Sequence, residues 1–586
     1  MYKLSDECQN VFEGIKATNS LYLCRGFEKT GEIMKILILA ILSFMGLACL
    51  HAQPKTEIRA TWLTTLGGMD WPHRKATSHA SIEAQKKELT DQLDALKAAN
   101  LNTVLFQTRL RGDVIYPSVV EPFAECLTGH TGQDPKYDPL RFAIEECHKR
   151  GLELHAWIVC IPIGNKRQVG LHKQHSVVKR QPKLCRLFNG TWYLDPGNPG
   201  TADYLSRIAR EITANYDVDG IHLDYIRYPE DGENFPDQDT YRKYGRKQDL
   251  KQWRRDNITR IVRRIYTDVK ALKPWVKVSS SPVGKYKDTS RYSSYGWNAY
   301  DVVYQDAQRW LEEGIHDALF PMMYFKGNQF YPFALDWQEN KHERWIVPGL
   351  GVYFLHPRQQ DWELDEVMRQ IYFSREVGLD GQAYFRNSFL LGNTKGLMDE
   401  LKMHFYTYPA VVPPMTWADS IAPTPPSGTE LRVPDKSVVL KWNPSTENTK
   451  SGVYYRLYAS NIYPVDTDNP QNLVATRIDE CRYTVTPELP WLQRIYWAVT
   501  AVDRFGNESS PTPFNRKREN ELTVFDGQLP QVPEGYTLII SDETGLEILR
   551  STHPDNSLRD RLGTGFFRFS LMAPDGTIKP IGVAVW

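Results

Sequence analysis

The chain has 586 residues, which is too long for one ordinary domain and predicts roughly three to four structural units. Lysine plus arginine and aspartate plus glutamate number 71 each, so there is no net charge to attract nucleic acid or an anionic membrane surface. Aromatic residues make up 12% of the chain, more than core packing usually needs, and exposed aromatic faces suit stacking on sugar rings.

Residues 34–53 have the pattern of a secretory signal peptide. A methionine and a lysine precede the apolar run "ILILAILSFMGLACL", which is too short for a comfortable membrane span, and "HAQ" follows it. We therefore expect translation to start at Met34, which leaves residues 1–33 as a mis-assigned start without structure. Lipidation of Cys49 and cleavage after "HA" are both open. Either route exports the protein to the periplasm, outer membrane or cell surface of a bacterium.

Residues 54–408 alternate short apolar strands with amphipathic helical patterns. A doubly wound open sheet would need a Gly-rich phosphate-binding turn after its first strand, and "LGGMDWP" is not such a turn. The pattern therefore predicts an α/β fold, a (β/α)8 TIM barrel, with the open sheet as the alternative. The eight expected strands cover residues 57–65, 102–109, 152–159, 220–227, 276–283, 318–325, 345–353 and 381–386.

Two smaller units are expected after the barrel. The Pro-rich segment 409–428 predicts a stiff linker, and residues 429–526 contain strands of period two such as "SVVLKW" and "IYWAVTAVD". This second segment resembles a fibronectin type III module, a β-sandwich of about 100 residues. Residues 527–586 predict a last small β-rich domain.

The stretch "VDGIHLDYIRYP" contains a candidate catalytic residue, Asp224, at the end of the fourth expected strand. In a barrel of this kind the chemistry lies at the carboxyl ends of the strands, where the βα loops build the open face. Other strand ends also supply polar or aromatic groups. The candidate substrate-binding residues are Arg109, Asp113, His155, Trp157, Tyr225, Arg227, Tyr324, Trp62, Asp70 and Tyr353.

Four motifs, "EIRATWLTTLGGMDWP", "VDGIHLDYIRYP", "YQDAQRWLEEGIHDALFPMMY" and "VPGLGVYF", together resemble the glycosyl-hydrolase-like family 10 of secreted bacterial barrel proteins. The resemblance covers residues 56–408. It implies cleavage of glycosidic bonds. A shorter likeness to the α-amylase superfamily places Asp224 at the position of the nucleophile, although His222 stands where that superfamily has arginine.

Glycoside hydrolysis needs two carboxyl groups, one ionised as nucleophile or base and one protonated to donate to the leaving oxygen. Asp224 is the expected first member of the pair. Glu230, in the loop "YPEDGEN", and Asp306, in "YQDAQRW", are the candidates for the second, and Asp113 is a further alternative. Asp306 can equally be the N-cap of the helix that follows it. The pairing and the stereochemical outcome are therefore open.

No cofactor or metal is expected. The acidic runs lack the spacing of a calcium loop, and the first strand lacks the histidine pair of metal-dependent barrel hydrolases. The leading hypothesis is a secreted glycoside hydrolase that cleaves a polysaccharide or peptidoglycan glycan strands, so that its partner is a carbohydrate polymer and membrane contact is limited to an N-terminal lipid. The alternative is a catalytically inactive carbohydrate-binding or surface-adhesion protein.

Overall fold

The computed structural model describes residues 53–245, 247–434, 437–486, 494–516, 523–525, 529–555 and 557–585. The expected mis-assigned start, Cys49 and nearly all of the expected signal peptide lie outside these residues. Within the described ranges, no helix combines the length and the apolar character needed to cross a membrane.

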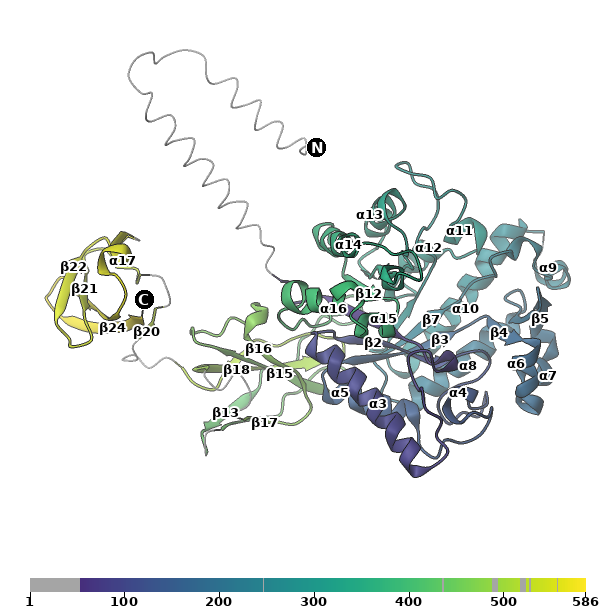
Figure 1. Cartoon of the computed structure of the whole chain (residues 1–586), viewed down its shortest axis with the longest axis horizontal. Helices are drawn as coiled ribbons and strands as arrows, with labels where there is room; N and C mark the ends of the chain where they lie inside the picture. Colours follow the sequence, from purple (N-terminus) through teal and green to yellow (C-terminus); the bar gives the residue numbers. More distant parts are fainter. Residues whose placement is uncertain are drawn as a thin grey trace, which may run out of the picture. The chain divides into compact units, whose positions relative to one another are not determined.

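A parallel sheet of nine strand segments forms the centre of the first part of the chain (Figure 1). Its order is β10-β9-β8-β7-β3-β2-β1-β12-β11. The segments are β1 (Ile58–Leu63), β2 (Thr103–Arg109), β3 (Glu153–Val159), β7 (Gly220–Asp224), β8 (Lys277–Ser280), β9 (Ala318–Leu319), β10 (Trp345–Ile346), β11 (Gly349–Leu350) and β12 (Gly381–Tyr384).

The two ends of this sheet meet along one stretch of chain. β10 pairs with β9 and β11 pairs with β12, yet only two residues separate β10 from β11. Between them, the Val347 N–H donates to the Leu319 carbonyl at 2.9 Å, and the Gly349 N–H donates to the Pro321 carbonyl at 2.8 Å. The sheet therefore curls round on itself, which confirms the predicted parallel α/β architecture.

Three of the strands are shorter than predicted because each contains a proline. Pro282, Pro321 and Pro348 lie within the stretches expected to continue β8, β9 and β10. Proline has no N–H to donate to a neighbouring strand, so regular pairing stops beside it.

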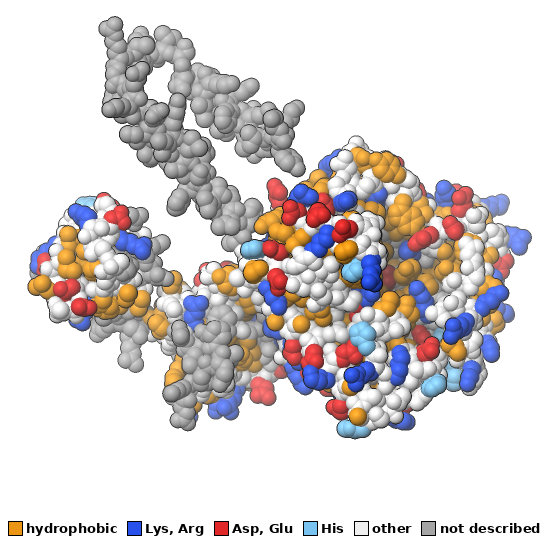
Figure 2. Space-filling view, viewed as in Figure 1, with side chains coloured by type: hydrophobic (Ala, Val, Ile, Leu, Met, Phe, Trp, Pro, Cys, Tyr) orange, Lys and Arg blue, Asp and Glu red, His pale blue; other side chains and the backbone are white. Residues whose placement is uncertain are grey.

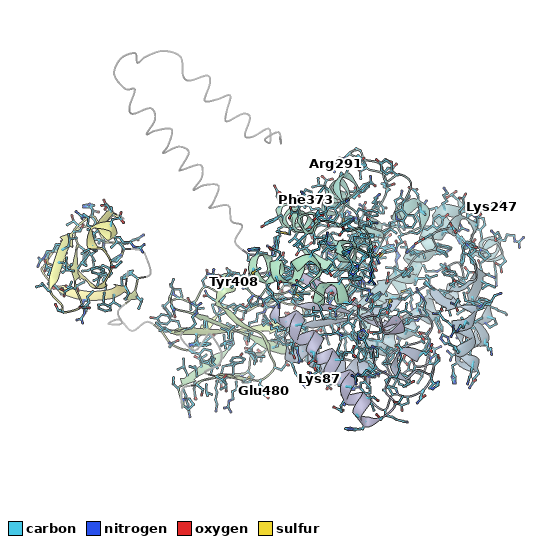
Figure 3. The ribbon with its side chains drawn as sticks, in the orientation of Figure 1. Lys87, Lys247, Arg291, Phe373, Tyr408 and Glu480 are labelled. Carbon is cyan, nitrogen blue, oxygen red and sulfur yellow. The ribbon has the colours of Figure 1, made fainter. Side chains whose placement is uncertain are left out.

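Helices connect the strands, and α8 and α10 pack against each other (Figure 1). Helix α3 (His79–Ala98) shows why they form: Ser78 caps its first turn, and Leu89, Leu93 and Leu96 face the core. Lys87, labelled in Figure 3, lies on its exposed side. The other helices of this part are α4 (Glu125–Thr128), α5 (Pro139–Lys149), α6 (Lys166–Leu171), α7 (Val177–Arg180), α8 (Pro199–Asn215), α9 (Gln238–Tyr244), α10 (Leu250–Leu272), α11 (Ala299–Val302), α12 (Ala307–Glu312), α13 (Tyr331–Glu339), α14 (Leu364–Glu376), α15 (Asn387–Leu391) and α16 (Leu397–Glu400).

A long excursion between β3 and β7 adds a small antiparallel sheet of its own. Strands β4 (Pro162–Asn165), β6 (Thr191–Leu194) and β5 (Cys185–Phe188) pair in that order, and α6 and α7 lie between β4 and β5 in the chain. We call residues 161–194 the insert. Because it follows the carboxyl end of β3, it belongs to the face on which strand-end chemistry is expected.

The interior of the sheet is closed at its other end by residues from later in the chain. Trp62, Trp157 and Phe320 form one buried cluster together with Met415 of the Pro-rich segment and Phe505 of the following β-rich part. The Met415 N–H donates to the Phe505 carbonyl at 2.8 Å. The segment predicted as a stiff linker therefore packs under the curled sheet, because it carries apolar side chains between its prolines.

Two β-rich parts follow, as predicted. The first has two antiparallel sheets, β13-β14-β17 and β16-β15-β18-β19, and the second has one five-stranded sheet in the order β20-β24-β23-β21-β22 with helix α17. Their elements are β13 (Ser427–Arg432), β14 (Val438–Asn443), β15 (Val453–Ser460), β16 (Leu473–Ile478), β17 (Arg482–Val485), β18 (Tyr496–Asp503), β19 (Thr512–Pro513), β20 (Thr523–Val524), β21 (Thr537–Ser541), β22 (Glu547–Ser551), α17 (Ser557–Leu562), β23 (Phe566–Met572) and β24 (Ile578–Val585).

Candidate active site

Asp224 is the last residue of β7, where the sequence predicted it, and its side chain is held by three donors. Oδ1 accepts hydrogen bonds from the Ser281 hydroxyl at 2.8 Å and from the Tyr225 N–H at 2.7 Å. Oδ2 accepts one from the Trp157 indole at 3.0 Å. These donors come from the strands on either side of β7 and from its own end, so the neighbouring strands fix the orientation of the carboxyl group.

Burial raises the pKa of the Asp224 carboxyl above its ordinary value. The hydrogen bonds from Ser281 and Tyr225, the Arg227 charge and the Trp157 hydrogen bond offset part of this effect. A buried carboxyl with a raised pKa and several fixed donors is a candidate for proton transfer.

Tyr225 turns the chain sharply away from the strand. Its φ of +47° lies in the left-handed region, which costs a non-glycine residue about 1–3 kcal/mol and persists where the surroundings enforce it. Its ring lies under two cations, with the Arg227 guanidinium 4.7 Å and the Arg111 guanidinium 5.3 Å from the ring centroid. The strained turn therefore places an aromatic ring and two arginines directly after Asp224.

A cleft of about 410 Å³ opens beside this turn. One wall comes from the loop after β7, including Tyr225, Arg227 and Glu230, and the opposite wall comes from the insert, including Gln168 and Tyr193. Arg111, from the loop after β2, completes it. The cleft lies on the face formed by the carboxyl ends of the strands, and its volume suits a small number of sugar units.

A second cleft of about 340 Å³ shares Arg111 and Gln168 with the first. Asp113, Glu125 and His172 are among its other lining residues. Because both clefts have two lining residues in common, they adjoin one another across the strand-end face. On the side of the molecule seen in Figure 2, acidic and basic side chains are interspersed.

The two candidates for the second carboxyl have different surroundings. Glu230 lines the first cleft, its side chain is 67% exposed, and its Oε1 lies 3.8 Å from Arg227 Nη2. Asp306 is buried, accepts a hydrogen bond from the Tyr286 hydroxyl at 2.5 Å, and has Arg309 and Arg255 of the helical layer as its charged neighbours. The Arg227 charge also lowers the pKa of Asp224, so one arginine interacts electrostatically with both Asp224 and Glu230. Asp306 has other arginines as its neighbours.

Asp306 does precede helix α12 as a cap residue, but its side chain makes no capping hydrogen bond. Burial raises the pKa of this carboxyl. The cause of its burial is packing between the loop after β8 and the helices, away from the lining of either described cleft.

Two predicted ligand contacts need correction because both side chains have other partners. Arg109 is fully buried, forms a bidentate ion pair with Glu121 at 2.7 and 2.8 Å, and also donates to the carbonyls of Val159 and Cys160. His155 pairs with Glu153 and lies opposite Gly220, the first residue of β7. Asp224 lies four residues further along β7 than Gly220, so His155 is about 13 Å from the strand end that carries Asp224.

Trp62 and Asp70 also have structural roles rather than the predicted ligand contacts. The Trp62 indole is buried and donates to His222 Nε2 at 3.2 Å, which leaves the neutral imidazole to donate from Nδ1 to Ser279 at 3.0 Å. Burial lowers the pKa of His222, in agreement with a neutral ring. Asp70 accepts from the Thr64 N–H at 2.8 Å and pairs with Arg386, which ties two loops together.

The remaining predicted residues lie at the strand-end face. Trp157 is buried and orients Asp224 instead of stacking on a sugar. Asp113 accepts from the Arg111 N–H at 2.9 Å and lines the second cleft. Tyr324 and Tyr353 are partly buried with ring centroids 5.8 Å apart. Burial first, and then the Asp224 charge, raise the pKa of Tyr324, so its hydroxyl lies within electrostatic reach of Asp224.

Sequence reasoning missed several residues of this region. Ser281 directly follows β8 and could have been found by the same strand-end argument as Asp224. Arg111 stands two residues beyond the predicted Arg109, and Gln168 and Tyr193 belong to the insert. The length of the insert, between two strands of one sheet, was the available signal for the last two residues.

Two observations concern metal-ligating residues and cysteines in the described ranges. There, no group of three or more His, Cys, Asp or Glu side chains is arranged to hold a metal ion. The five described cysteines, Cys126, Cys147, Cys160, Cys185 and Cys481, are unpaired.

Three comparisons show which known proteins the chain is similar to. The family model described as "Glycosyl hydrolase-like 10" matches residues 57–351. Glycosyl hydrolase YngK of Bacillus subtilis is 32% identical over 483 residues, which are 78% of this chain and 93% of that protein. Glycosyl hydrolase DigH of Escherichia coli is 33% identical over 294 residues, 47% of this chain and 66% of that protein. Among solved structures, the PgaB (BpsB) glycoside hydrolase domain from Bordetella bronchiseptica has a TM-score of 0.43 at 14% identity, covering 60% of this chain and 99% of that one.

Proposed function

Because the chain belongs to the glycosyl hydrolase-like 10 family and is a glycoside hydrolase, we propose that it cleaves the O-glycosidic bonds of a polysaccharide or of peptidoglycan glycan strands with Asp224 and Glu230 as its two carboxyl groups. One of the two donates a proton to the leaving oxygen, and the other acts as base or nucleophile.

The observation that carries the proposal is the setting of Asp224. Three fixed donors hold this buried carboxyl at the end of β7, beside a cleft that is lined by Glu230 of the loop after β7. Burial raises the pKa of Asp224, whereas Glu230 is mostly exposed to solvent. Different surroundings for two carboxyl groups are what separates their roles in glycosidases.

The test is release of reducing ends by residues 54–586, with peptide-free peptidoglycan strands and a panel of polysaccharides as substrates. Asp224→Asn and Glu230→Gln each remove one proton-transfer group, so each is expected to lower the rate at least about a hundredfold. Asp306→Asn is the matched control, because this buried aspartate contacts Tyr286 and lines neither described cleft. It is expected to keep the parent rate.

Each outcome separates the hypotheses. An equal loss in Asp306→Asn and Asp224→Asn, with Glu230→Gln active, would replace Glu230 by Asp306 in the pair. A parent that binds a glycan but releases no reducing ends would favour the carbohydrate-binding alternative. An Asp224→Asn variant as active as the parent would remove Asp224 from the reaction.

We also propose that residues 429–526 form a fibronectin type III domain and that the protein is exported. The first proposal is supported by the three- and four-stranded antiparallel sheets in this segment. The second is supported by the signal-peptide pattern before residue 54. Fractionation of expressing cells, with radiolabelled palmitate incorporation in the parent and in Cys49→Ser, tests export and lipidation together.

A further inference from the structure

Arg111 occupies the junction between the two clefts. It follows β2, lines both clefts, and its guanidinium stacks over Tyr225 together with that of Arg227. Arg111 and Arg227 also act electrostatically on the Tyr193 hydroxyl, which comes from the insert on the opposite wall. Two arginines and two tyrosines therefore lie close together in the first cleft. One of the tyrosines, Tyr225, directly follows Asp224 in the chain.

The guanidinium of Arg111 has no anionic partner among the described residues. Its Nη1 is buried and has no hydrogen-bond partner there, and the same is true of Nε of Arg227, a side chain that is 94% buried. Asp113 accepts from the backbone N–H of Arg111 through Oδ1, and its Oδ2 lies 3.5 Å from His172 Nε2. A buried N–H of a charged group without an acceptor is costly, so an acceptor supplied from outside the protein would stabilise it.

The insert side of the junction is positively charged, whereas the carboxylates that line the two clefts, Glu230, Asp231, Asp113 and Glu125, come from other loops. The insert contains seven lysines and arginines, including Arg167, and no aspartate or glutamate. On the other wall, Glu230 lies 3.8 Å from Arg227, which leaves Arg111 as the cation of this junction without an ion pair in the described chain. A planar guanidinium with free N–H groups recognises a carboxylate through two parallel hydrogen bonds.

We propose that Arg111 is a specificity-determining residue that binds the carboxylate of an acidic sugar unit at the junction of the two clefts. The substrate is then a glycan in which a carboxylate-bearing unit lies next to the cleaved bond. The carboxylate can belong to a lactyl ether on an amino sugar or to a uronic acid, since both present the same group. This inference rests on the proposed function, because it takes the two clefts as the glycan-binding site. It does not require that cleavage be measured.

Binding by the Asp224→Asn protein tests the inference without turnover. The probes are peptide-free peptidoglycan strands, the same strands with carboxyl groups reduced to alcohols, and polygalacturonate. Adding Arg111→Gln is expected to weaken binding at least tenfold for one carboxylated probe and less than twofold for the reduced strands. Arg167→Gln is the matched control, because it removes an exposed cation of the insert that lines neither cleft.

The pattern of losses decides the source of the carboxylate. A selective loss on peptidoglycan strands assigns the lactyl group, and a selective loss on polygalacturonate assigns the uronate. Equal losses on carboxylated and reduced strands, losses in Arg167→Gln as large as in Arg111→Gln, or no binding of either carboxylated probe would overturn the inference. Arg111→Lys keeps the charge without the planar fork, and an intermediate affinity in this variant separates recognition from misfolding.

Failure of the proposed function gives a different result. In that case the parent releases no reducing ends from any probe, while the Arg111-dependent preference for a carboxylated probe is still measured in the Asp224→Asn background.

Discussion

Replacing Trp157 by Phe removes the indole N–H that donates to Asp224 Oδ2 at 3.0 Å and keeps an aromatic ring in the interior. This bond stabilises the ionised form of Asp224 and lowers its pKa against the effect of burial. Its loss therefore makes the carboxyl hold its proton to higher pH. The variant is expected to show one limb of the pH–rate profile displaced upward.

The size of the displacement follows from the burial of the bond. A hydrogen bond to a charged group contributes about 1.5–3 kcal/mol, and 1.36 kcal/mol corresponds to one pH unit, so the limb is expected to move by about one to two pH units. The moving limb identifies the role of Asp224. A shift of the acidic limb means that Asp224 works ionised, as base or nucleophile, and a shift of the alkaline limb means that it works protonated, as the acid.

The assay is kcat/KM against pH for the parent and the variant on whichever glycan the parent cleaves. Trp62→Phe is the matched control, since its indole is also buried inside the curled sheet but donates to the neutral His222 at 3.2 Å and not to Asp224. If neither limb moves in Trp157→Phe, or if Trp62→Phe moves the same limb, Asp224 is not the group whose ionisation governs the reaction.

Three further expectations concern stability. The pKa of Asp224 is higher in the folded than in the unfolded chain, so ionisation of this carboxyl destabilises the folded parent. As the pH rises from the ordinary aspartate pKa through the folded pKa, the parent is expected to lose free energy of unfolding relative to Asp224→Asn. Urea midpoints between about pH 4 and 7 measure this loss. Phe505→Ala is expected to cost about 3–5 kcal/mol, against about 0.5 or less for the exposed Ile462→Ala, in the same assay. Arg109→Ala leaves Glu121 buried and unpaired, at a cost of about 3–5 kcal/mol, without displacing the pH–rate limbs.

The position of Asp224 could be predicted because two local signals agree there. An apolar run marks a buried strand, and a carboxylate directly after it must lie at the carboxyl edge of a parallel sheet. The role of Arg109 could not be predicted in the same way. Whether it or Arg111 faces the cleft depends on Glu121, twelve residues away, which takes up the guanidinium of Arg109 in the interior.

Long-range packing limited the sequence prediction elsewhere as well. The prolines of residues 409–428 indicated a stiff connector, but the position of Met415 under the curled sheet depends on Phe505, ninety residues later. Asp306 illustrates the same limit on the side of the active site. Its N-cap position was visible in the sequence, whereas its contact with Tyr286 depends on how the loop after β8 folds against the helices.

The closure of the sheet by β10, β11 and β12 has a consequence for the order of synthesis. Until the chain has been made as far as β12, the strands from β1 to β9 can form only an open sheet with unpaired edges, which are prone to associate with other chains. The interior is sealed later still, when Phe505 emerges. The ribosome has therefore made most of this protein before its enzymatic domain can complete its fold. Until then, the cell must keep the nascent chain from associating with other chains.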